Sequence, residues 1–144
     1  MKLSTRARYG TRALLDLARH QAGKPVQLKE IASRQKISLH YLEHIIAPLV
    51  GSGIVRSIRG AHGGLQLTRQ PKDLKLIEIV QLLEGATAPV DCVNSPESCD
   101  RSDLCVTREV WSEMKQAIDE KLDSITLQDL VDRQIEKEQA VTTR

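Results

Sequence analysis

The chain has 144 residues, the size of one ordinary domain or of a small domain with an additional arm. Hydrophobic residues make up 40% of it, charged residues 28% and aromatic residues only 2%, which excludes a fibrous or largely disordered protein and predicts an aliphatic core. The net charge is +2, and neither a bilayer-length apolar run nor a signal-peptide apolar block is present, so we expect a cytoplasmic protein that is neither membrane-inserted nor secreted.

Three helices are predicted in the first third of the chain. Ser4 is a typical N-cap residue for a helix that continues to about Gln21. A second, short helix is predicted over residues 27–35. Ser38 is the expected N-cap of a third helix that runs toward Val50, with an apolar stripe on one side.

Two short extended segments follow, at residues 54–59 and 65–68, and each alternates apolar with polar side chains. The glycine-rich tip between them, residues 60–64, is typical of a tight hairpin that projects from the surface. Three helices, a strand, a glycine tip and a strand form the order of a winged helix-turn-helix, in which the third helix enters the major groove of DNA. We therefore predict a mainly α fold with a small β-hairpin wing, and a DNA-binding region over residues 1–70.

The second half of the chain is predicted to be helical, with one irregular loop. Residues 71–85 read as a linker followed by an apolar packing helix, and residues 86–105 as a cysteine-containing loop. A long helix over residues 104–125 carries a continuous apolar seam, which is typical of a dimerisation helix and predicts a homodimer; the alternative is an arm folded back on its own domain. Residues 126–144 are predicted to form a short last helix and a frayed tail. The seam consists of Leu104, Trp111, Met114, Ile118 and Leu122.

Charge is distributed unevenly between the two halves. Residues 1–70 carry 12 Lys and Arg against 3 Asp and Glu, whereas residues 71–144 carry 9 against 16. This polarity indicates that the first half meets a polyanion such as double-stranded operator DNA, the alternative being a solvated basic face. Serine can bond to several base edges, a carboxylate can accept from cytosine N4, and arginine can hold phosphates or enter a minor groove. The candidate DNA contacts are Ser38, His40, Tyr41 and Glu43 on the third helix, Arg56, Ser57, Arg59 and Gly60 on the wing, and Arg6 and Arg8 on the first helix.

All three cysteines fall in one short segment, at Cys92, Cys99 and Cys105. An odd number of cysteines in a chain expected in the cytoplasm argues against a disulfide framework. Neither spacing is C-x-x-C, so a zinc knuckle or a thioredoxin-type motif fits poorly. Three thiolates on a loop, the last at a helix start, could hold an iron–sulfur cluster; zinc, a thiol redox switch and incidental cysteines are the alternatives.

Several motifs together carry a resemblance to a known family. They are Met1-Lys2-Leu3-Ser4 at the start, Ser38-x-x-Tyr41-Leu42-Glu43 in the third helix, Arg59-Gly60-x-x-Gly63-Gly64 at the wing, Leu83-Glu84-Gly85, and the three cysteines. On these residues the chain resembles the Rrf-type winged-helix regulators, the group that includes IscR and NsrR, over about residues 1–130.

The resemblance implies a homodimeric bacterial transcription factor. An enzyme is not expected on separate grounds, because the sequence has no Ser/His/Asp order, no phosphate-binding G-x-x-x-x-G-K motif and no paired carboxylates with matched spacing. Its similarity to IscR implies a [2Fe–2S] cluster on Cys92, Cys99 and Cys105, received from the cluster-assembly machinery, and control of iron–sulfur cluster biogenesis genes. The alternative within the group is an NsrR-type repressor that senses nitric oxide with a [4Fe–4S] cluster.

The fourth cluster ligand is not evident from the sequence. No fourth cysteine exists, and the histidine ligand that IscR-like proteins carry near the last cysteine has no counterpart, because no histidine lies in the loop. The aspartate that NsrR-like proteins use in the first helix is replaced by Arg8. We hypothesise that Glu43 on the third helix is the fourth ligand, with His40 or His44 as the alternatives.

Overall fold

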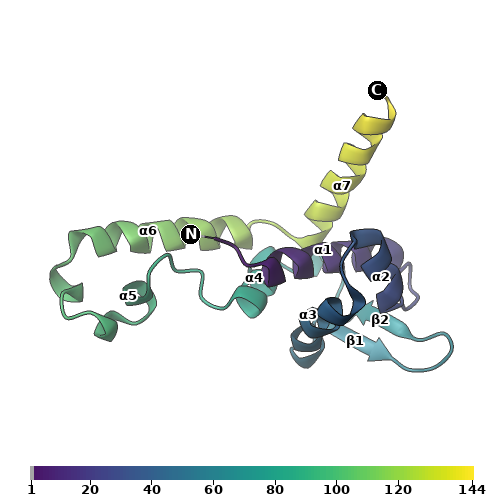
Figure 1. Cartoon of the computed structure of the whole chain (residues 1–144). Helices are drawn as coiled ribbons and strands as arrows, with labels where there is room; N and C mark the ends of the chain where they lie inside the picture. The colour runs from purple at the N-terminus through teal and green to yellow at the C-terminus, as the bar shows by residue number, and fades with distance from the viewer. Residues whose placement is uncertain (1) are drawn as a thin grey trace.

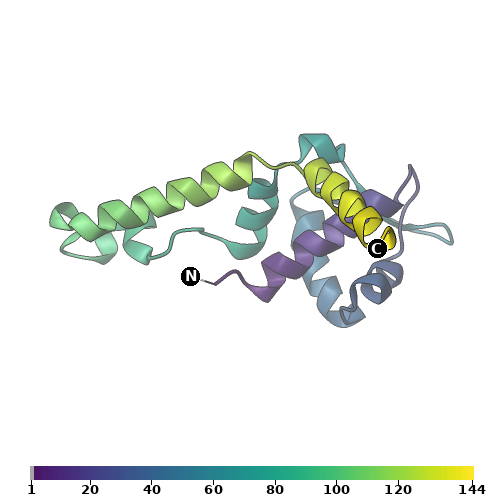
Figure 2. The same cartoon turned by 90° about the horizontal axis from the view of Figure 1, so that it is seen from above.

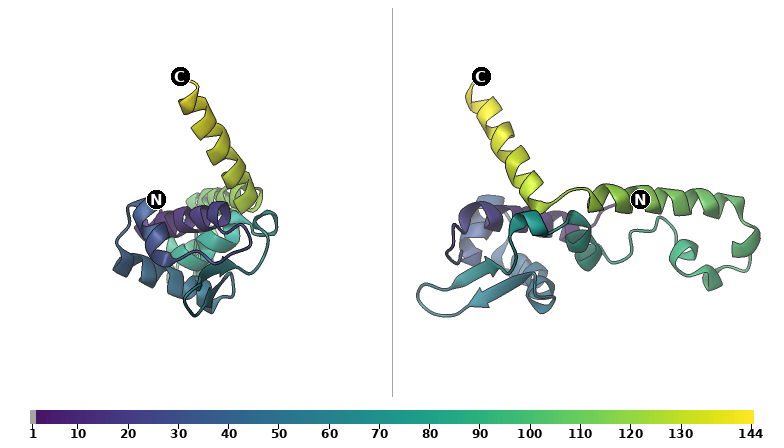
Figure 3. Two further views of the ribbon diagram at one scale, coloured as in Figure 1. Left: turned by 90° about the vertical axis from the view of Figure 1, so that its right-hand side faces the viewer. Right: turned by 180° about the vertical axis from the view of Figure 1, so that it is seen from behind.

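The computed structural model describes residues 2–144 as a compact lobe from which two helices project (Figure 1). The lobe contains α1 (Thr5–His20), α2 (Leu28–Gln35), α3 (Leu39–Gly51), the hairpin of β1 (Val55–Ile58) and β2 (Gly64–Leu67), a 3-10 turn η1 (Pro71–Asp73) and α4 (Leu76–Glu84). The helix α6 (Val106–Asp123) forms an arm on one side of the lobe, and α7 (Leu127–Thr142) projects in another direction (Figure 3). The predicted fold class, mainly α with a β-hairpin wing, is confirmed.

The helix starts follow local capping chemistry. The Ser4 hydroxyl accepts a hydrogen bond from the backbone N–H of Ala7, and the Ser38 hydroxyl accepts one from Tyr41, so both predicted N-caps are present. Between α2 and α3 the chain reverses at Lys36, whose φ of 57° is left-handed. This short turn sets α3 across α2, as a helix-turn-helix requires.

The core of the lobe is aliphatic, as the composition predicts. The largest fully buried side chains include Leu14 and Leu17 of α1, Ile31 of α2, Leu42, Ile45 and Leu49 of α3, Ile79 of α4 and Leu127 of α7. The core therefore extends beyond the predicted region 1–70, because α4 and the first turns of α7 pack on the same helices. At Gly10 of α1 a Cβ atom would lie 2.2 Å from the Cδ1 of Leu83, so glycine allows α4 to approach α1 closely.

The wing is a two-stranded antiparallel hairpin in which Val55 pairs with Leu67 and Arg56 with Gln66. Backbone hydrogen bonds between Val26 and Leu65 attach the hairpin to the loop before α2. Gly64 lies so close to Val26 that an added Cβ would be 2.6 Å from its backbone, and its φ is +153°. The inner ends of the strands are thus fixed to the lobe, while the tip projects from it (Figure 1).

The whole arm, which consists of residues 86–105 and α6, differs from the predicted loop followed by a helix. Residues 86–105 contain three short helical turns, α5 (Asp91–Asn94), η2 (Pro96–Ser98) and η3 (Ser102–Leu104), which the sequence analysis treats as irregular. The long helix begins at Val106 and not at Leu104, because Cys105 has an extended backbone and forms the N-cap. Seen from above, α6 runs beside this segment along the whole arm (Figure 2).

The last helix, α7, is longer than predicted. The predicted capping box is present, since Thr126 and Asp129 exchange side chain–backbone hydrogen bonds. The helix then continues through the segment 136–142 that the sequence analysis expects to be frayed. A bidentate ion pair between Arg19 of α1 and Glu138 holds it there, with the shorter N–O distance at 2.6 Å. Within residues 2–144, no helix combines the length and the apolar character needed to cross a bilayer.

Candidate DNA-binding face and cysteine segment

The third helix presents one polar face to solvent. Its apolar stripe, Leu42, Ile45, Ile46 and Leu49, is buried as predicted. The candidate DNA contacts Ser38, His40, Tyr41 and Glu43 are all exposed, together with His44. A helix held by a buried stripe and open on its other side has the form needed to enter a major groove.

The wing residues are also exposed, and one of them is fixed in place. Arg56, Ser57, Arg59 and Gly60 lie at the surface of β1 and of the tip. The guanidinium of Arg56 donates two hydrogen bonds to the Gln66 side-chain oxygen, at 2.7 and 3.2 Å. This cross-strand contact orients Arg56 on the outer face of the hairpin.

The first helix adds the predicted basic residues to this face. It also adds an aromatic contact that the sequence analysis does not predict. Arg6 and Arg8 are exposed, as expected for residues that meet phosphates. The Tyr9 ring packs edge-on against Tyr41 of α3 with a centroid distance of 6.1 Å, and the Arg12 guanidinium lies over the Tyr9 ring at 5.2 Å. These contacts join the basic surface of α1 to the start of α3.

A buried carboxylate joins α1 to α2 beneath this face. Asp16 is 2% exposed and accepts hydrogen bonds from Arg34 at 2.7 and 3.1 Å and from the Gln35 amide at 2.9 Å. The hydrogen bond to Asp16 raises the pKa of the Arg34 guanidinium. This contact fixes the position of α2, and through the short turn at Lys36 that of α3, yet no local motif reveals it.

The three cysteine thiols are free and lie in the arm. Cys92 is in α5 and half-buried, Cys99 is exposed, and Cys105 is the half-buried N-cap of α6. A hydrogen bond with the Thr107 hydroxyl, 3.2 Å from the sulfur, lowers the pKa of the Cys105 thiol, and the Arg108 backbone N–H lowers it further. The Arg108 side chain donates to the Cys92 carbonyl oxygen at 2.8 Å and so joins the two ends of the segment.

The donor set suits an iron–sulfur cluster, but the ligands are not gathered. Thiolates are the usual ligands of such clusters, and three are available within fourteen residues. Across residues 2–144, however, no three His, Cys, Asp or Glu side chains are close enough to hold one metal ion. The segment would therefore have to close around a cluster.

With this geometry established, comparison with known proteins decides the family. The family model described as "Rrf2: Iron-dependent Transcriptional regulator" matches residues 3–133. The chain belongs to the Rrf2 family. It is accordingly a DNA-binding transcriptional regulator and not an enzyme.

The relatives cover almost the whole chain. Protein rrf2 of Nitratidesulfovibrio vulgaris is 46% identical over 131 residues, which are 91% of this chain and 87% of that protein. The solved structure of IscR from T. potens is 44% identical, with a TM-score of 0.77 over 92% of this chain and 88% of that one. The structure of CymR, the global cysteine regulator of B. subtilis, is 38% identical, with the same TM-score of 0.77 over 92% of this chain and 98% of that one.

The hypothesised fourth ligands are not near the cysteines within one Rrf2 chain. Glu43, His40 and His44 belong to α3 in the lobe, whereas the cysteines lie in the arm around α5 (Figures 1 and 2). The hypothesis that Glu43, His40 or His44 completes the ligand set therefore stays a prediction, and within one chain these residues and the thiols lie in different parts of the molecule.

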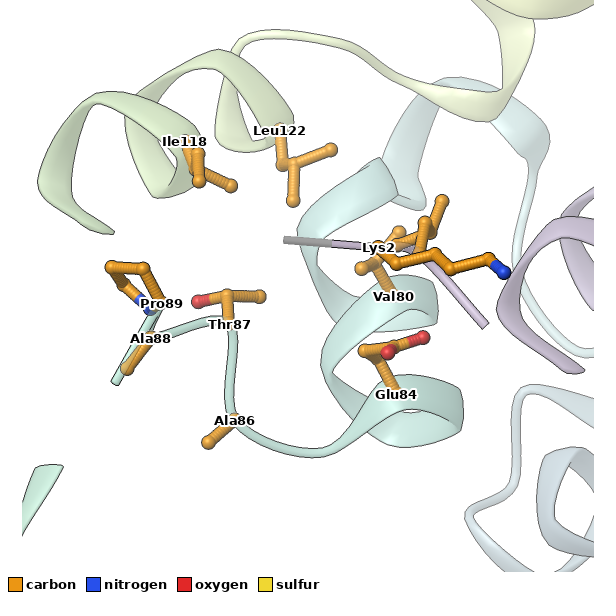
Figure 4. Close-up of a pocket in the computed structure, with 10 residues that line it drawn as sticks. Lys2, Val80, Glu84, Ala86, Thr87, Ala88, Pro89, Ile118 and Leu122 are labelled. Atoms are coloured by element: carbon orange, nitrogen blue, oxygen red, sulfur yellow. The ribbon is translucent and has the colours of Figure 1, made fainter. Parts of the chain in front are cut away.

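The predicted dimerisation seam of this Rrf2 chain is split between two environments. No residue of α6 is buried, Trp111 is 36% exposed, and Leu104 just before the helix is 91% exposed. Near the base of the arm, Ile118 and Leu122 point instead into an open cavity of about 410 Å³, which α4 and residues 86–89 also line (Figure 4). Met114, between these groups, is half-buried. The base of the arm thus packs on α4, while its outer part contacts the short helix α5 and leaves Val110 and Trp111 partly exposed.

Proposed function

We propose that the protein is a homodimeric regulator whose affinity for operator DNA depends on a [2Fe–2S] cluster held by Cys92, Cys99 and Cys105, and that it controls genes of iron–sulfur cluster biogenesis. The observation that carries this proposal is that all three free thiols lie in one arm of an Rrf2 protein that is 44% identical to the IscR of T. potens. The cluster-assembly machinery is the proposed donor of the cluster.

The residues of the arm have distinct tasks in this proposal. The Thr107 hydroxyl stabilises the thiolate of Cys105 and lowers the pKa of this thiol, which favours the form that binds iron. Arg108 keeps Cys92 beside the start of α6, so two ligands are already on adjoining elements. Cys99 is exposed and free to close on the other two. The bound cluster would supply a cross-link that is sensitive to iron supply and oxidants.

Dimerisation through α6 is supported by the burial pattern. An amphipathic helix of 18 residues with no buried side chain is unusual unless a second molecule covers it. Val106 and Val110 are 71% and 47% exposed, and Trp111 adds an aromatic anchor. A helix of this length spans about 27 Å, so antiparallel pairing of two arms would place each cysteine segment beside the partner's lobe.

This arrangement gives the fourth-ligand hypothesis a definite form. Glu43, or else His40 or His44, would have to reach the cluster from the α3 helix of the other protomer. Reconstituting Glu43→Ala and finding the visible spectrum of the wild-type cluster would remove Glu43 from the ligand set. The corresponding changes at His40 and His44 test the alternatives.

DNA binding is proposed to use the basic face described above. The N-terminal turns of α3 would read base edges, with Ser38 and Glu43 as the readers, while Arg56 and Arg59 of the wing and the arginines of α1 contact phosphates and grooves. Since the phosphate contacts displace counterions, operator affinity should fall steeply with salt. An Arg56→Ala variant should lose affinity for all sequences, whereas Glu43→Ala should alter sequence preference.

Anaerobic reconstitution with iron and sulfide tests the cluster directly. Wild-type protein should become coloured, and Mössbauer spectra should show a [2Fe–2S] rather than a [4Fe–4S] centre. Cys92→Ala should abolish or alter the cluster, while the control Ser98→Ala, at an exposed serine of the same segment, should not. Operator affinity should differ between cluster-loaded and cluster-free protein by roughly 5- to 150-fold, the usual range of allosteric coupling. Colourless protein, or equal affinities, would refute the sensing role.

A second function is favoured by two observations. The similarity to CymR, a cysteine regulator by its description, is as close in TM-score as the similarity to IscR, and no ligand group is gathered among residues 2–144. This second function is that of a regulator that binds DNA without a cluster and responds to thiol or cysteine supply. DNA binding by colourless protein that changes with thiol oxidation would support this function. An NsrR-type function would instead show a [4Fe–4S] spectrum and a response to nitric oxide.

A further inference from the structure

Two histidines of α3 face each other at the surface of the protein. His40 and His44 are one helical turn apart, so their side chains lie on the same side of the helix. Their Nε2 atoms are 3.3 Å apart, and the two rings are nearly perpendicular, with centroids 4.7 Å apart. The side chain of His40 is 85% exposed. The two nitrogens share a hydrogen bond whose donor depends on the tautomer, and both face one point that is open to solvent; a metal ion there would replace the shared proton.

The separation of these nitrogens matches a metal chelate. Zinc binds imidazole nitrogen at about 2.0–2.1 Å in tetrahedral geometry, which places two such nitrogens about 3.3–3.4 Å apart. We propose that His40 and His44 form a bidentate site for one divalent transition-metal ion of the zinc class on the surface of α3, in which case neither histidine is the fourth ligand of a cluster on the cysteine segment. The donor set selects such ions, because imidazole favours Zn²⁺, Ni²⁺ and Cu²⁺ over Mg²⁺ and Ca²⁺.

A carboxylate next to the pair supports the same site. The Glu43 Oε2 atom lies 4.0 Å from Nδ1 of His40, the ring nitrogen that faces away from His44. A carboxylate on the outer ring nitrogen of a ligating histidine fixes its tautomer and makes it a better ligand. The Glu43 side chain is 58% exposed, so it is free to close the remaining distance when Nε2 binds the metal.

The other histidines offer no such site. His20 directs Nδ1 at the Asp16 carbonyl oxygen, 2.8 Å away, and lies beside the Asp16 carboxylate. His62 is exposed at the wing tip, without a second histidine in sequence reach. His62 is therefore a matched control for a surface imidazole that binds metal alone.

The position of the site has a consequence that depends on the proposed function. Two protein ligands leave about two positions of a tetrahedral zinc ion for water or another ligand. If α3 enters the major groove, these positions face DNA, where guanine N7 is an acceptor. The ion also adds two positive charges beside Glu43, so the metal-loaded protein should bind operator DNA more tightly.

The site is tested first without DNA. The full chain with all three cysteines changed to serine is titrated with Zn²⁺ against a chromophoric chelator, because thiolates would otherwise compete for the metal. One ion per chain should bind, and the imidazole nitrogen resonances of His40 and His44 should shift while those of His62 do not. In the same background, His40→Ala or His44→Ala should weaken binding at least tenfold, and His62→Ala should leave it unchanged. Equal binding by the His40→Ala/His44→Ala double variant would overturn the proposal.

The coupling to DNA is tested separately in the same background. Zinc at a saturating concentration should raise operator affinity several-fold, and this increase should be absent from the His40→Ala/His44→Ala variant. An operator affinity that is independent of zinc would refute the coupling. Because the first titration needs no DNA, failure of the proposed regulatory function would not be confused with failure of the metal site.

Discussion

The buried carboxylate of Asp16 gives the sharpest test of how the DNA-binding face is held. In Asp16→Asn one carboxylate oxygen becomes an amide NH₂ group, which then faces the N–H donors of Arg34 and Gln35 that lie 2.7 to 3.1 Å away. At least one charge-assisted hydrogen bond is lost, worth about 1.5–3 kcal/mol, and a buried donor is left without an acceptor. The Arg34 side chain is 34% exposed and can turn to water, so we expect a net loss of about 2–3 kcal/mol of unfolding free energy.

Urea unfolding followed by circular dichroism measures this loss, at one fixed protein concentration because a dimer's stability depends on it. A loss of this size should also lower Tm by roughly 4–12 °C. The control is Asp123→Asn, which removes an ion pair with Lys75 whose partners are about half exposed. The control should change the unfolding free energy by less than about 0.5 kcal/mol. If Asp16→Asn lowers the unfolding free energy by no more than Asp123→Asn does, the buried carboxylate does not hold α2 on α1.

Three further predictions concern the arm, the last helix and the core. Changing Thr107 to Val should raise the pKa of Cys105 toward the ordinary value of a thiol. With the other two cysteines changed to serine, the pH profile of Cys105 alkylation should therefore move to higher pH, and an unmoved profile would contradict the role of the hydroxyl. The Arg19 guanidinium lowers the pKa of Glu138, so the ion pair stabilises the fold fully above the ordinary pKa of a glutamate, and this contribution is lost as the pH falls through the lowered pKa of the folded state. Arg19→Gln should raise the midpoint of the Glu138 carboxyl-carbon NMR titration, and an identical midpoint would exclude the ion pair in solution. Gly10→Ala should lower the unfolding free energy measured in urea by about 1–2 kcal/mol, since overpacking against the Leu83 side chain of α4 outweighs the gain of about 1 kcal/mol in helix propensity. A more stable variant would show that the Leu83 side chain can move aside.

The winged helix-turn-helix is predictable because its signals are local. Ser4 and Ser38 cap helices through contacts three residues away, and the apolar stripes follow the helical period. The glycines at residues 60–64 mark the tip of the hairpin without any knowledge of its neighbours. Each of these signals depends on residues close in the sequence, so the order of elements follows from them.

The missed features depend on contacts between distant residues. Arg19 and Glu138 are 119 positions apart, and their ion pair supports the part of α7 that a local pattern assigns to a frayed tail. Asp16 and Arg34 are 18 apart and on different helices, so neither helix shows why its charge is there. The separation of the α3 candidate ligands from the thiols is not evident from the sequence for the same reason. Sequence motifs identify residue types but do not give the distance between the lobe and the arm.

Within one chain, the contacts that connect the cysteine segment to the DNA-binding face pass through α4. The base of the arm is fixed beside α4 by the backbone hydrogen bond from Leu76 to Ile125, at 2.8 Å, and α4 holds the start of α1 through the Glu84 carboxylate, 2.9 Å from the Ser4 backbone nitrogen. A change at the cysteine segment must first reorient the arm, whose base packs on α4 and whose α6 residues are at most half-buried in a single chain. Pairing with a second α6 would remove that freedom. A cluster could then change the spacing of the two α3 helices, which is the quantity that a palindromic operator reads. On this reasoning, variants that break the dimer should abolish the effect of the cluster on DNA binding even where all three thiols remain.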